Sequence, residues 1–251
     1  MTSDFIPHRI PLPLYKSAII WYAAQYRKLR NIVYWSTEPD RLLTFVKKIA
    51  DEGDVPGILA ACDKYCVEKE WIMHLGGEKG KIFCEIIRDC QPRLCLELGT
   101  YCGFSAILLA SLLPDDGKVY TVEFDENYAK AAKALVKYAK LDHKITILCG
   151  DAGEVIPTLR DRYSLDKFDF VFIDHHKPLY CRDLKLLVSN DHLRKGSVVV
   201  ADDLRWPGAP DYDEYVQKSK DFKSTFFDTK TVFLDILDVM GKSVFTGGDP
   251  S

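Results

Sequence analysis

The segment LCLELGTYCGFS, residues 94–105, predicts a buried strand, then a tight glycine turn, then the start of a helix. Glycines at such a junction let a ligand approach the backbone, and the free amides of a helix N-terminus bind polar groups of that ligand. We therefore expect a binding site at the carboxyl end of this strand. A plain tight turn between strand and helix is the alternative.

An acid follows the next apolar strand, Val119–Val122, about twenty residues beyond the glycine turn. Glu123 stands where an acid usually holds ribose hydroxyls. The glycine spacing is G-x-x-x-G, so the pyrophosphate signature of dinucleotide enzymes, G-x-G-x-x-G, is absent. With Glu97 before the turn and Glu123 after it, the pattern favours a nucleoside ligand such as S-adenosylmethionine.

Composition limits the class of protein. The chain has 251 residues and 47% apolar content, enough for one sizeable α/β core. A net charge of -3 implies no whole-surface attraction to nucleic acid. No apolar run reaches the roughly eighteen residues of a membrane-spanning helix, and residues 1–13 lack the features of a signal peptide.

Eight cysteines are present without a C-x-x-C pair. They indicate free thiols in a reducing compartment, so we expect a cytoplasmic protein.

Residues 1–54 are predicted to form an N-terminal segment and linker, and residues 55–251 to form the main domain. Residues 8–35 contain five Lys or Arg residues, no acid and many bulky apolar groups. Three alternatives stay open for them: a helix packed on the domain, a segment lying on a membrane surface, or a disordered or partner-binding arm. Asp54 and Pro56 predict the start of a helix after the linker.

Strands and helices alternate along the main domain, which predicts an α/β fold with a doubly wound, mostly parallel sheet of seven strands. The expected strands are Leu94–Leu98, Val119–Val122, Ile145–Cys149, Phe168–Ile173 and Ser197–Ala201. The expected helices are Ile58–Lys69, Lys79–Asp89, Ser105–Leu113, Asn127–Leu141, Glu154–Arg162, Arg182–Leu193 and Tyr212–Lys220.

The tail of the chain has a different pattern. Residues Thr231–Leu237 and Lys242–Phe245 are predicted as strands with no helix between them. Without a crossover helix they can pair only in antiparallel fashion. We therefore expect an antiparallel C-terminal strand in the sheet.

Three acids follow two of the predicted strands. Asp174 comes after Phe168–Ile173, and Asp202 and Asp203 come at the end of Ser197–Ala201. Because the carboxyl ends of parallel strands face one crevice, these acids are expected near the glycine turn. Three carboxylates repel one another unless a cation lies among them, and oxygen ligands favour Mg²⁺ or Ca²⁺. Helix capping is the alternative role.

Lys177 follows Asp174 by three residues on the same loop. Beside a divalent cation the pKa of its ammonium group should fall toward neutrality, which would suit a general base. A surface lysine is the alternative. Of the adjacent His175 and His176, we expect one to pack or stack near the ligand and the other to be solvated.

Ordered blocks of this sequence resemble the catechol O-methyltransferase family, which also includes a transmembrane relative. The blocks are Glu70–Met73, Leu96–Ser105, Val171–Lys177 and Ala201–Asp203, with further matches at Ile145–Leu148 and Pro207–Asp211. The resemblance implies a Rossmann-like methyltransferase. It would move the methyl group of S-adenosylmethionine to a hydroxyl of a catechol, such as a catecholamine, with the help of Mg²⁺.

The resemblance also implies a role for particular residues. Asp174, Asp202 and Asp203 would bind Mg²⁺, and Lys177 would take a proton from a catechol hydroxyl. The implied cofactor-binding residues are Glu97, Gly99, Tyr101, Ser105, Glu123, Asp151, Asp174 and His176. The implied substrate residues are Trp71, Met73, Lys177 and Pro207.

The chain departs from the family pattern around the metal and the adenine. The third metal ligand of the family is an asparagine, but this chain has Asp203. His176 replaces the aromatic residue that stacks on adenine. Ala152 and Gly153 replace a serine and a glutamine at the adenine edge.

The family's glutamate for the second catechol hydroxyl has no counterpart here. Val232 aligns with it, and Asp228 and Asp235 are the candidate substitutes.

Other functions were weighed against catechol methylation. A non-catalytic partner or trafficking protein on the same fold is the main alternative. Methylation of nucleic acid or protein is less favoured, because the predicted catalytic loops carry no basic patch. We expect a monomer that binds a small molecule and no nucleic acid, with membrane contact only through residues 8–35.

Overall fold

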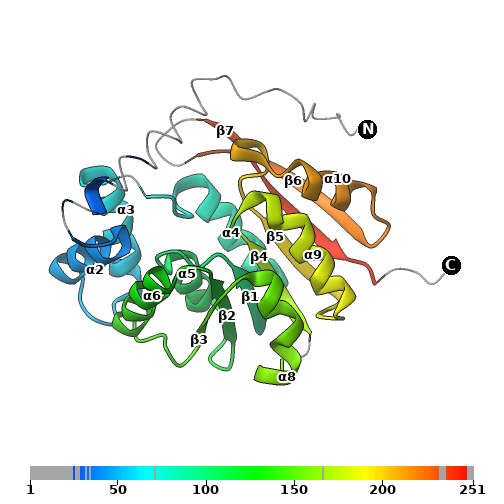
Figure 1. Ribbon diagram of the computed structural model, residues 1–251, viewed down its shortest axis with the longest axis horizontal. Helices are drawn as coiled ribbons and strands as arrows, with labels where there is room; N and C mark the ends of the chain where they lie inside the picture. The colour runs from blue at the N-terminus through cyan, green and yellow to red at the C-terminus, as the bar shows by residue number, and fades with distance from the viewer. Residues whose placement is uncertain are drawn as a thin grey trace.

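Seven strands form one mixed sheet in the computed structural model (Figure 1), which describes residues 25, 29–31, 33, 35–70, 72–165, 167–231 and 236–247. The strands are β1 (Leu94–Leu98), β2 (Lys118–Glu123), β3 (Ile145–Cys149), β4 (Phe168–Ile173), β5 (Leu193–Ala201), β6 (Phe222–Lys230) and β7 (Leu237–Phe245). Their order across the sheet is β3-β2-β1-β4-β5-β7-β6. Only β7 runs against its neighbours β5 and β6, so the predicted sheet with one antiparallel C-terminal strand is confirmed.

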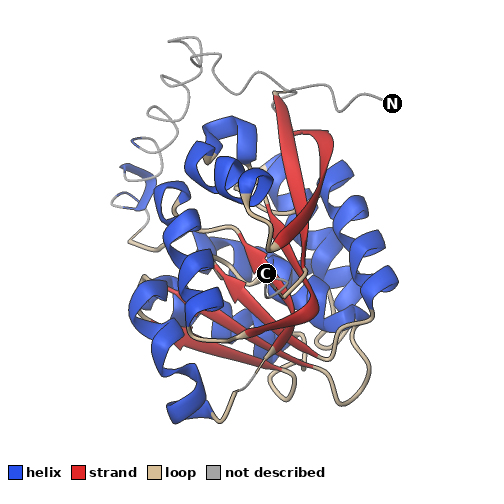
Figure 2. Ribbon diagram, turned by 90° about the vertical axis from the view of Figure 1, so that its right-hand side faces the viewer, coloured by secondary structure: helices blue, strands red, loops and turns tan. Residues whose placement is uncertain are grey.

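Helices cover both faces of this sheet (Figure 2). The longer helices are α2 (Glu38–Ile49), α3 (Val55–Glu68), α4 (Gly77–Cys90), α5 (Phe104–Leu112), α6 (Glu126–Tyr138), α9 (Tyr180–Ser189) and α10 (Pro210–Lys218). The shorter elements are α7 (Ala152–Val155), η1 (Ile156–Thr158), α8 (Leu159–Tyr163), η2 (Lys177–Leu179) and η3 (Leu204–Gly208). The predicted helix Glu154–Arg162 is thus three short pieces, because Pro157 stands at the start of η1.

The core has two halves, one on each face of the sheet. Phe170 and Phe172 of β4 pack among α2 to α6, whereas Val171 and Ile173 of the same strand pack among α7 to α10. Successive side chains of a strand point to opposite faces, which explains why this central strand is apolar throughout.

Helix α2 lies before the predicted domain boundary and still packs into the first half of the core. Its Leu42 and Val46 are fully buried there. Asp54 accepts a hydrogen bond from Gly57 N and caps α3, so the predicted helix start after the linker is confirmed. The division of the chain into an N-terminal segment and a main domain at residue 54 stays a prediction.

Residues 8–35 fall for the most part outside the described residues. Over the described part of the chain, no helix combines the length and apolar character needed to cross a membrane. All eight cysteines are free thiols, as predicted; four are buried, and Cys149 is exposed.

The tail differs from the prediction. The outer strand β6 spans Phe222–Lys230, so the predicted strand Thr231–Leu237 was wrong. Thr231 and Ile236 lie outside both β6 and β7. Residues 232–235 lie outside the described residues. An edge strand needs only one covered face, and the polar residues of β6 hid its pattern. The predicted strand Lys242–Phe245 lies within β7.

The predicted helix Arg182–Leu193 is also too long. Helix α9 ends at Ser189, and Leu193 already belongs to β5. Asp191 adopts a left-handed backbone with φ 56°, which turns the chain out of the helix.

The switch in strand order positions the crevice. The chain runs from β1 outward to β2 and β3 and then returns to β4 on the other side of β1. A crevice therefore opens beyond the carboxyl ends of β1 and β4. Gly99 follows β1 with φ 104°, and a Cβ there would lie 2.5 Å from the carbonyl oxygen of Asp174. Only glycine allows these two strand ends to approach so closely.

Replacing Gly99 by alanine should therefore destabilise the protein beyond the cost of its backbone angle. Gly99→Ala combines roughly 1–2 kcal/mol of left-handed strain with about 1–3 kcal/mol from the collision with Asp174. The matched control is Gly196→Ala, since Gly196 has φ 94° and nothing within 4 Å of its Cβ position. Urea unfolding should show the larger loss in Gly99→Ala, and equal losses would contradict the close approach.

Candidate active site

A cleft of about 870 Å³ opens at the carboxyl ends of the strands. It gathers most of the residues singled out in the sequence: Met73, Gly99, Tyr101, Ser105, Glu123, Asp151, Asp174, His176, Lys177, Asp202, Asp203 and Pro207. Glu97 does not line the cleft and is fully buried beneath the glycine turn. Trp71 lies outside the described residues.

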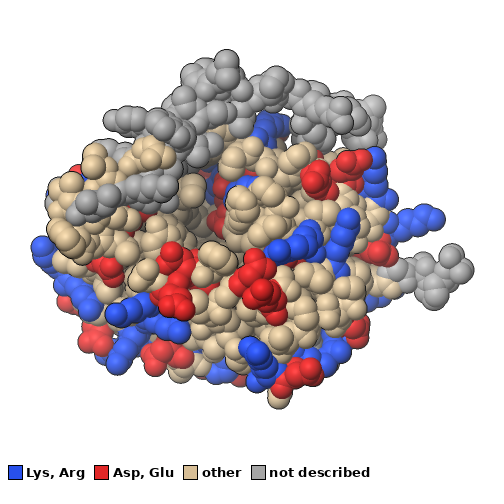
Figure 3. All heavy atoms as spheres, in the orientation of Figure 1, with Lys and Arg blue, Asp and Glu red and all other residues tan. Residues whose placement is uncertain are grey.

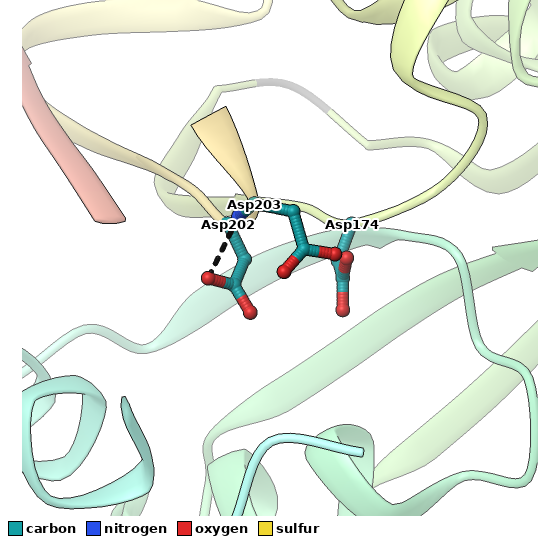
Figure 4. Close-up of side chains that lie close together, drawn as sticks. All are labelled: Asp174, Asp202 and Asp203. Carbon is teal, nitrogen blue, oxygen red and sulfur yellow. Dashed lines mark hydrogen bonds between the residues drawn. The ribbon is translucent and has the colours of Figure 1, made fainter. Parts of the chain in front are cut away.

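The three predicted metal ligands come together at one point of the cleft. Asp174 follows β4, and Asp202 and Asp203 follow β5, its parallel neighbour. One carboxylate oxygen of each lies within 4.8 Å of the others. Figure 4 shows the three carboxylates on the same side of the two strand ends, with Asp203 N donating to Asp202 Oδ1 at 2.8 Å.

Lys177 reaches the same point from η2. Its Nζ lies 2.8 Å from Asp174 Oδ1, 2.9 Å from Asp203 Oδ2 and 2.7 Å from the Tyr180 hydroxyl. Burial opposes its charge, but Asp174 and Asp203 raise the pKa of Lys177 well above its usual range. The expected fall of the Lys177 pKa toward neutrality is therefore not produced by the protein groups alone.

A second lysine, Lys79 at the start of α4, was missed by the sequence analysis. Its Nζ lies 2.9 Å from Asp202 Oδ1, 2.6 Å from Asp203 Oδ1 and 2.6 Å from Asp238 Oδ2. The sequence did contain a signal for this lysine, because Lys79 and Phe83 are four residues apart on the buried face of α4. A lysine on the apolar face of a helix indicates a buried anionic partner.

The surroundings of the acids push their pKa values in different directions. Burial raises the pKa of Asp174, and burial together with the Asp203 charge raises the pKa of Asp202 well above its usual range. Burial acts on Asp203 as well, but Lys177 and Lys79 hold its pKa well below the usual range. Asp203 is therefore the firmly ionised member of the trio.

On the other side of the crevice, Glu123 is held by backbone amides. Its Oε2 accepts from Tyr101 N at 2.7 Å and its Oε1 from Asp125 N at 3.0 Å. Each carboxylate oxygen can accept a second hydrogen bond, so Glu123 can still receive hydroxyl donors from the cleft.

Asp151 is oriented in a similar way, with a partner that the sequence analysis did not find. Its Oδ1 accepts from Gly153 N at 2.8 Å and from Arg182 Nη2 at 2.9 Å. A Cβ at Gly153 would lie 2.7 Å from Arg182 Cζ. The guanidinium group therefore occupies the space of a side chain at position 153. It also pairs with Asp183 at 2.6 Å.

The two adjacent histidines have different surroundings. His175 Nε2 lies 2.6 Å from Asp183 Oδ2, and the His175 ring stacks on Tyr180 at 5.1 Å. His176 is exposed and lines the cleft.

The loop before α4 is anchored to the N-terminal helices. Glu70 accepts from Arg41 Nε and Nη2 at 2.9 and 2.6 Å and from the Tyr65 hydroxyl at 2.9 Å. His74 Nε2 lies 2.6 Å from Asp63 Oδ1. Burial opposes the charge of His74, yet the contact with Asp63 raises its pKa to about 9. Between these anchors, Met73 lies half exposed at the cleft.

The candidate substitutes for the missing glutamate do not line the cleft in the described part of the chain. The Asp228 side chain is 77% exposed on β6, with Arg205 Nη2 at 3.6 Å from its Oδ1. Val232 and Asp235 lie outside the described residues.

On the face shown in Figure 3, acidic and basic side chains are interspersed without a broad area of one sign.

Known proteins are similar to this chain in sequence and in fold. A family model described as O-methyltransferase matches residues 52–228. Catechol O-methyltransferase from Bos taurus is 37% identical over 232 residues, which cover 92% of this chain and 85% of the relative. The chain belongs to the catechol O-methyltransferase family. It is an O-methyltransferase by that membership, and the resemblance inferred from the sequence blocks is confirmed.

Two further relatives define the breadth of the similarity. The transmembrane O-methyltransferase of Homo sapiens is 36% identical over 192 residues, covering 76% of this chain and 66% of the relative. The crystal structure of the O-methyltransferase TomG from Streptomyces achromogenes, in complex with SAM, aligns with a TM-score of 0.66 at 25% identity. That alignment covers 79% of this chain and 92% of TomG.

Glu97 beneath the glycine turn should make stability depend on pH. Burial raises its pKa to about 8, from an ordinary value of 4.5. Between these values the folded protein keeps a proton that the unfolded chain has lost, so stability should fall as pH rises. From about pH 5 to about pH 8 the loss attributable to Glu97 is on the order of 3 kcal/mol.

Urea unfolding of the wild type and of Glu97→Gln, which cannot titrate, checks this prediction. The difference between the two free energies of unfolding should shift steadily in favour of the variant as pH rises. Parallel curves would show that Glu97 is ionised in the folded state.

Proposed function

We propose that this protein transfers the methyl group of S-adenosylmethionine to a hydroxyl of a catechol-type substrate in a Mg²⁺-dependent reaction. The observation that carries the proposal is the meeting of three carboxylates and Lys177 in the same cleft as the Gly99 turn and Glu123. Family membership supports the reaction class, and the TomG complex supports the methyl donor.

The residues fit S-adenosylmethionine. Gly99 has no side chain to block close approach, and Glu123 offers two preset acceptors for ribose hydroxyls. We assign Tyr101 and Ser105 to the methionine end, and Asp151 and His176 to the adenine. Glu97 is assigned a supporting role beneath this site, where the Thr121 hydroxyl donates to its Oε2.

The donor set of Asp174, Asp202 and Asp203 fits a hard divalent cation, because all three offer carboxylate oxygens. When bound, Mg²⁺ would hold two vicinal hydroxyls and lower their pKa values.

Lys177 is the proposed base. In the free protein its ammonium group is held by Asp174 and Asp203. With a cation on the same carboxylates that attraction would be weaker, and Lys177 Nζ in its neutral form would accept the proton of the substrate hydroxyl. The phenolate oxygen then bonds to the methyl carbon while the carbon–sulfur bond breaks and sulfur keeps the electron pair. Met73 and Pro207, with Trp71, would hold the ring in line for this transfer.

A non-catalytic partner or trafficking protein on the same fold is the alternative proposal. It would bind its partner through residues outside the cleft and would show no turnover. Deleting residues 1–35 separates the two proposals, since an enzyme keeps its turnover and an adaptor loses its partner or its membrane.

Methylation of a catechol such as dopamine tests the main proposal. Purified full-length protein with S-adenosylmethionine and Mg²⁺ should form the O-methylated product, detected by mass spectrometry, and EDTA should abolish it. Asp174→Asn should lower kcat/KM by about 100-fold or more, because it removes a charged oxygen ligand from the proposed cation site. Asp191→Asn, at an exposed ion pair with Lys167, is the control and should be silent. Binding of S-adenosylmethionine without turnover on any catechol would refute the substrate assignment.

Substitutions that disturb Arg182 should change the binding of the methyl donor alone. Gly153→Ala pushes the guanidinium group away from Asp151, so calorimetry should show S-adenosylmethionine affinity falling about three- to tenfold. Arg182→Met should lose a similar amount, whereas Lys185→Met on the same helix should lose nothing. Unchanged binding by Arg182→Met would remove Asp151 from the adenine site.

A further inference from the structure

The Lys79 ammonium group is surrounded by three carboxylates. It donates hydrogen bonds to Asp203 Oδ1 and Asp238 Oδ2, and its Nζ forms an ion pair with Asp202 Oδ1 at 2.9 Å. The Lys79 side chain is only 4% exposed, although it borders the cleft. Its contacts are therefore with the acids of the cluster and suit a role in positioning them.

Asp238 connects Lys79 to the turn that follows the metal ligands. Its side chain is fully buried on β7. Its Oδ2 faces Lys79, while its Oδ1 accepts from Arg205 N at 3.1 Å and from Trp206 N at 3.0 Å. These amides belong to η3, which begins directly after Asp203 and carries Pro207 at the cleft. One carboxylate thus fixes both the lysine and the backbone beyond the ligands.

Asp203 depends on Lys79 for its orientation. Lys79 holds its Oδ1 at 2.6 Å and Lys177 holds its Oδ2 at 2.9 Å. Lys79 also holds the outer oxygen of Asp202 at 2.9 Å. One ammonium group therefore sets the spacing of two adjacent carboxylates, which would otherwise repel each other.

The formal charges complete the argument. Counted as fully ionised, as a bound cation would require, Asp174, Asp202, Asp203 and Asp238 carry four negative charges against the two ammonium groups of Lys79 and Lys177, which leaves a formal charge of −2. One divalent cation cancels that charge. Without Lys79 the cluster would keep a surplus of negative charge and lose the group that joins α4, β5 and β7.

We propose that Lys79 and Asp238 are positioning residues that hold the Asp202 and Asp203 carboxylates in place for a divalent cation. This inference rests on the proposed function for the presence of the cation. In this proposal the two residues set the geometry of the site, and they compensate the additional negative charge of Asp203.

Direct titration of the full-length protein with Mn²⁺, followed by electron paramagnetic resonance of the free ion, tests the proposal without any turnover. Lys79→Met should weaken Mn²⁺ binding by about tenfold or more, the usual scale for a residue that orients metal ligands. Lys79→Arg keeps the charge and should recover part of the affinity. Lys81→Met removes an exposed charge from the same helix and should bind like the wild type.

Charge coupling gives a second readout. In an Asp203→Asn background, Lys79→Met should cost less affinity than in the wild type, since the carboxylate that it compensates is gone. Should Lys79→Met fail to show a cooperative thermal transition, Asp238→Asn decides, with an expected loss of about three- to tenfold.

The outcomes separate the two proposals. Mn²⁺ binding by folded Lys79→Met that equals or exceeds the wild type would overturn the positioning role, because the ammonium group would then act only as a competing charge. Unchanged Mn²⁺ binding by Asp238→Asn would also overturn the positioning role. Failure of the wild type to bind Mn²⁺ at millimolar concentration would instead reject the metal site itself, and the positioning role with it.

Discussion

Four carboxylates, two of them buried and two partly buried, share one corner of this protein because two lysine ammonium groups lie among them. Removing charge from water is costly, and the cost is met only when each buried ion has close partners of opposite sign. Lys79 and Lys177 supply those partners from opposite sides of the acids. The position of α4, the end of β5 and the start of β7 all follow from this requirement, since each contributes a charge that is unstable without the others.

The sheet brings that charged corner next to the glycine turn. Parallel strands end at the same edge, and the change in strand order between β1 and β4 leaves an opening there. Gly99 lets the two strand ends approach each other, and backbone amides hold Glu123 on the far side. A cationic methyl donor and an acceptor hydroxyl can thus meet where protein atoms from distant parts of the chain already converge.

Local patterns in the sequence were sufficient for the parallel strands and for the acids at their ends. The strand, glycine turn and helix at residues 94–105 form as expected, and Asp174 lies beside Asp202 and Asp203 because β4 and β5 are neighbours. The edge strand β6 escaped prediction, since half of its residues face water and carry polar groups.

Long-range partners were harder to foresee. Lys79 and Asp238 are 159 residues apart, and no local periodicity links them. The same limit applied to Arg182 beside Gly153, where the absence of one side chain makes room for another. The pKa of Lys177 rises among the protein groups alone, because its anionic neighbours follow β4 and β5 together, and its fall beside a cation stays a prediction.

The backbone at residue 203 restricts which amino acids can stand there. Asp203 has φ 58° and ψ 36°, a left-handed conformation that asparagine and aspartate tolerate better than other residues with a side chain. Exchange between these two leaves the main chain undisturbed and alters the electrostatics of the pocket by one unit. A substitution at this position can therefore change the charge of the cleft without changing the fold.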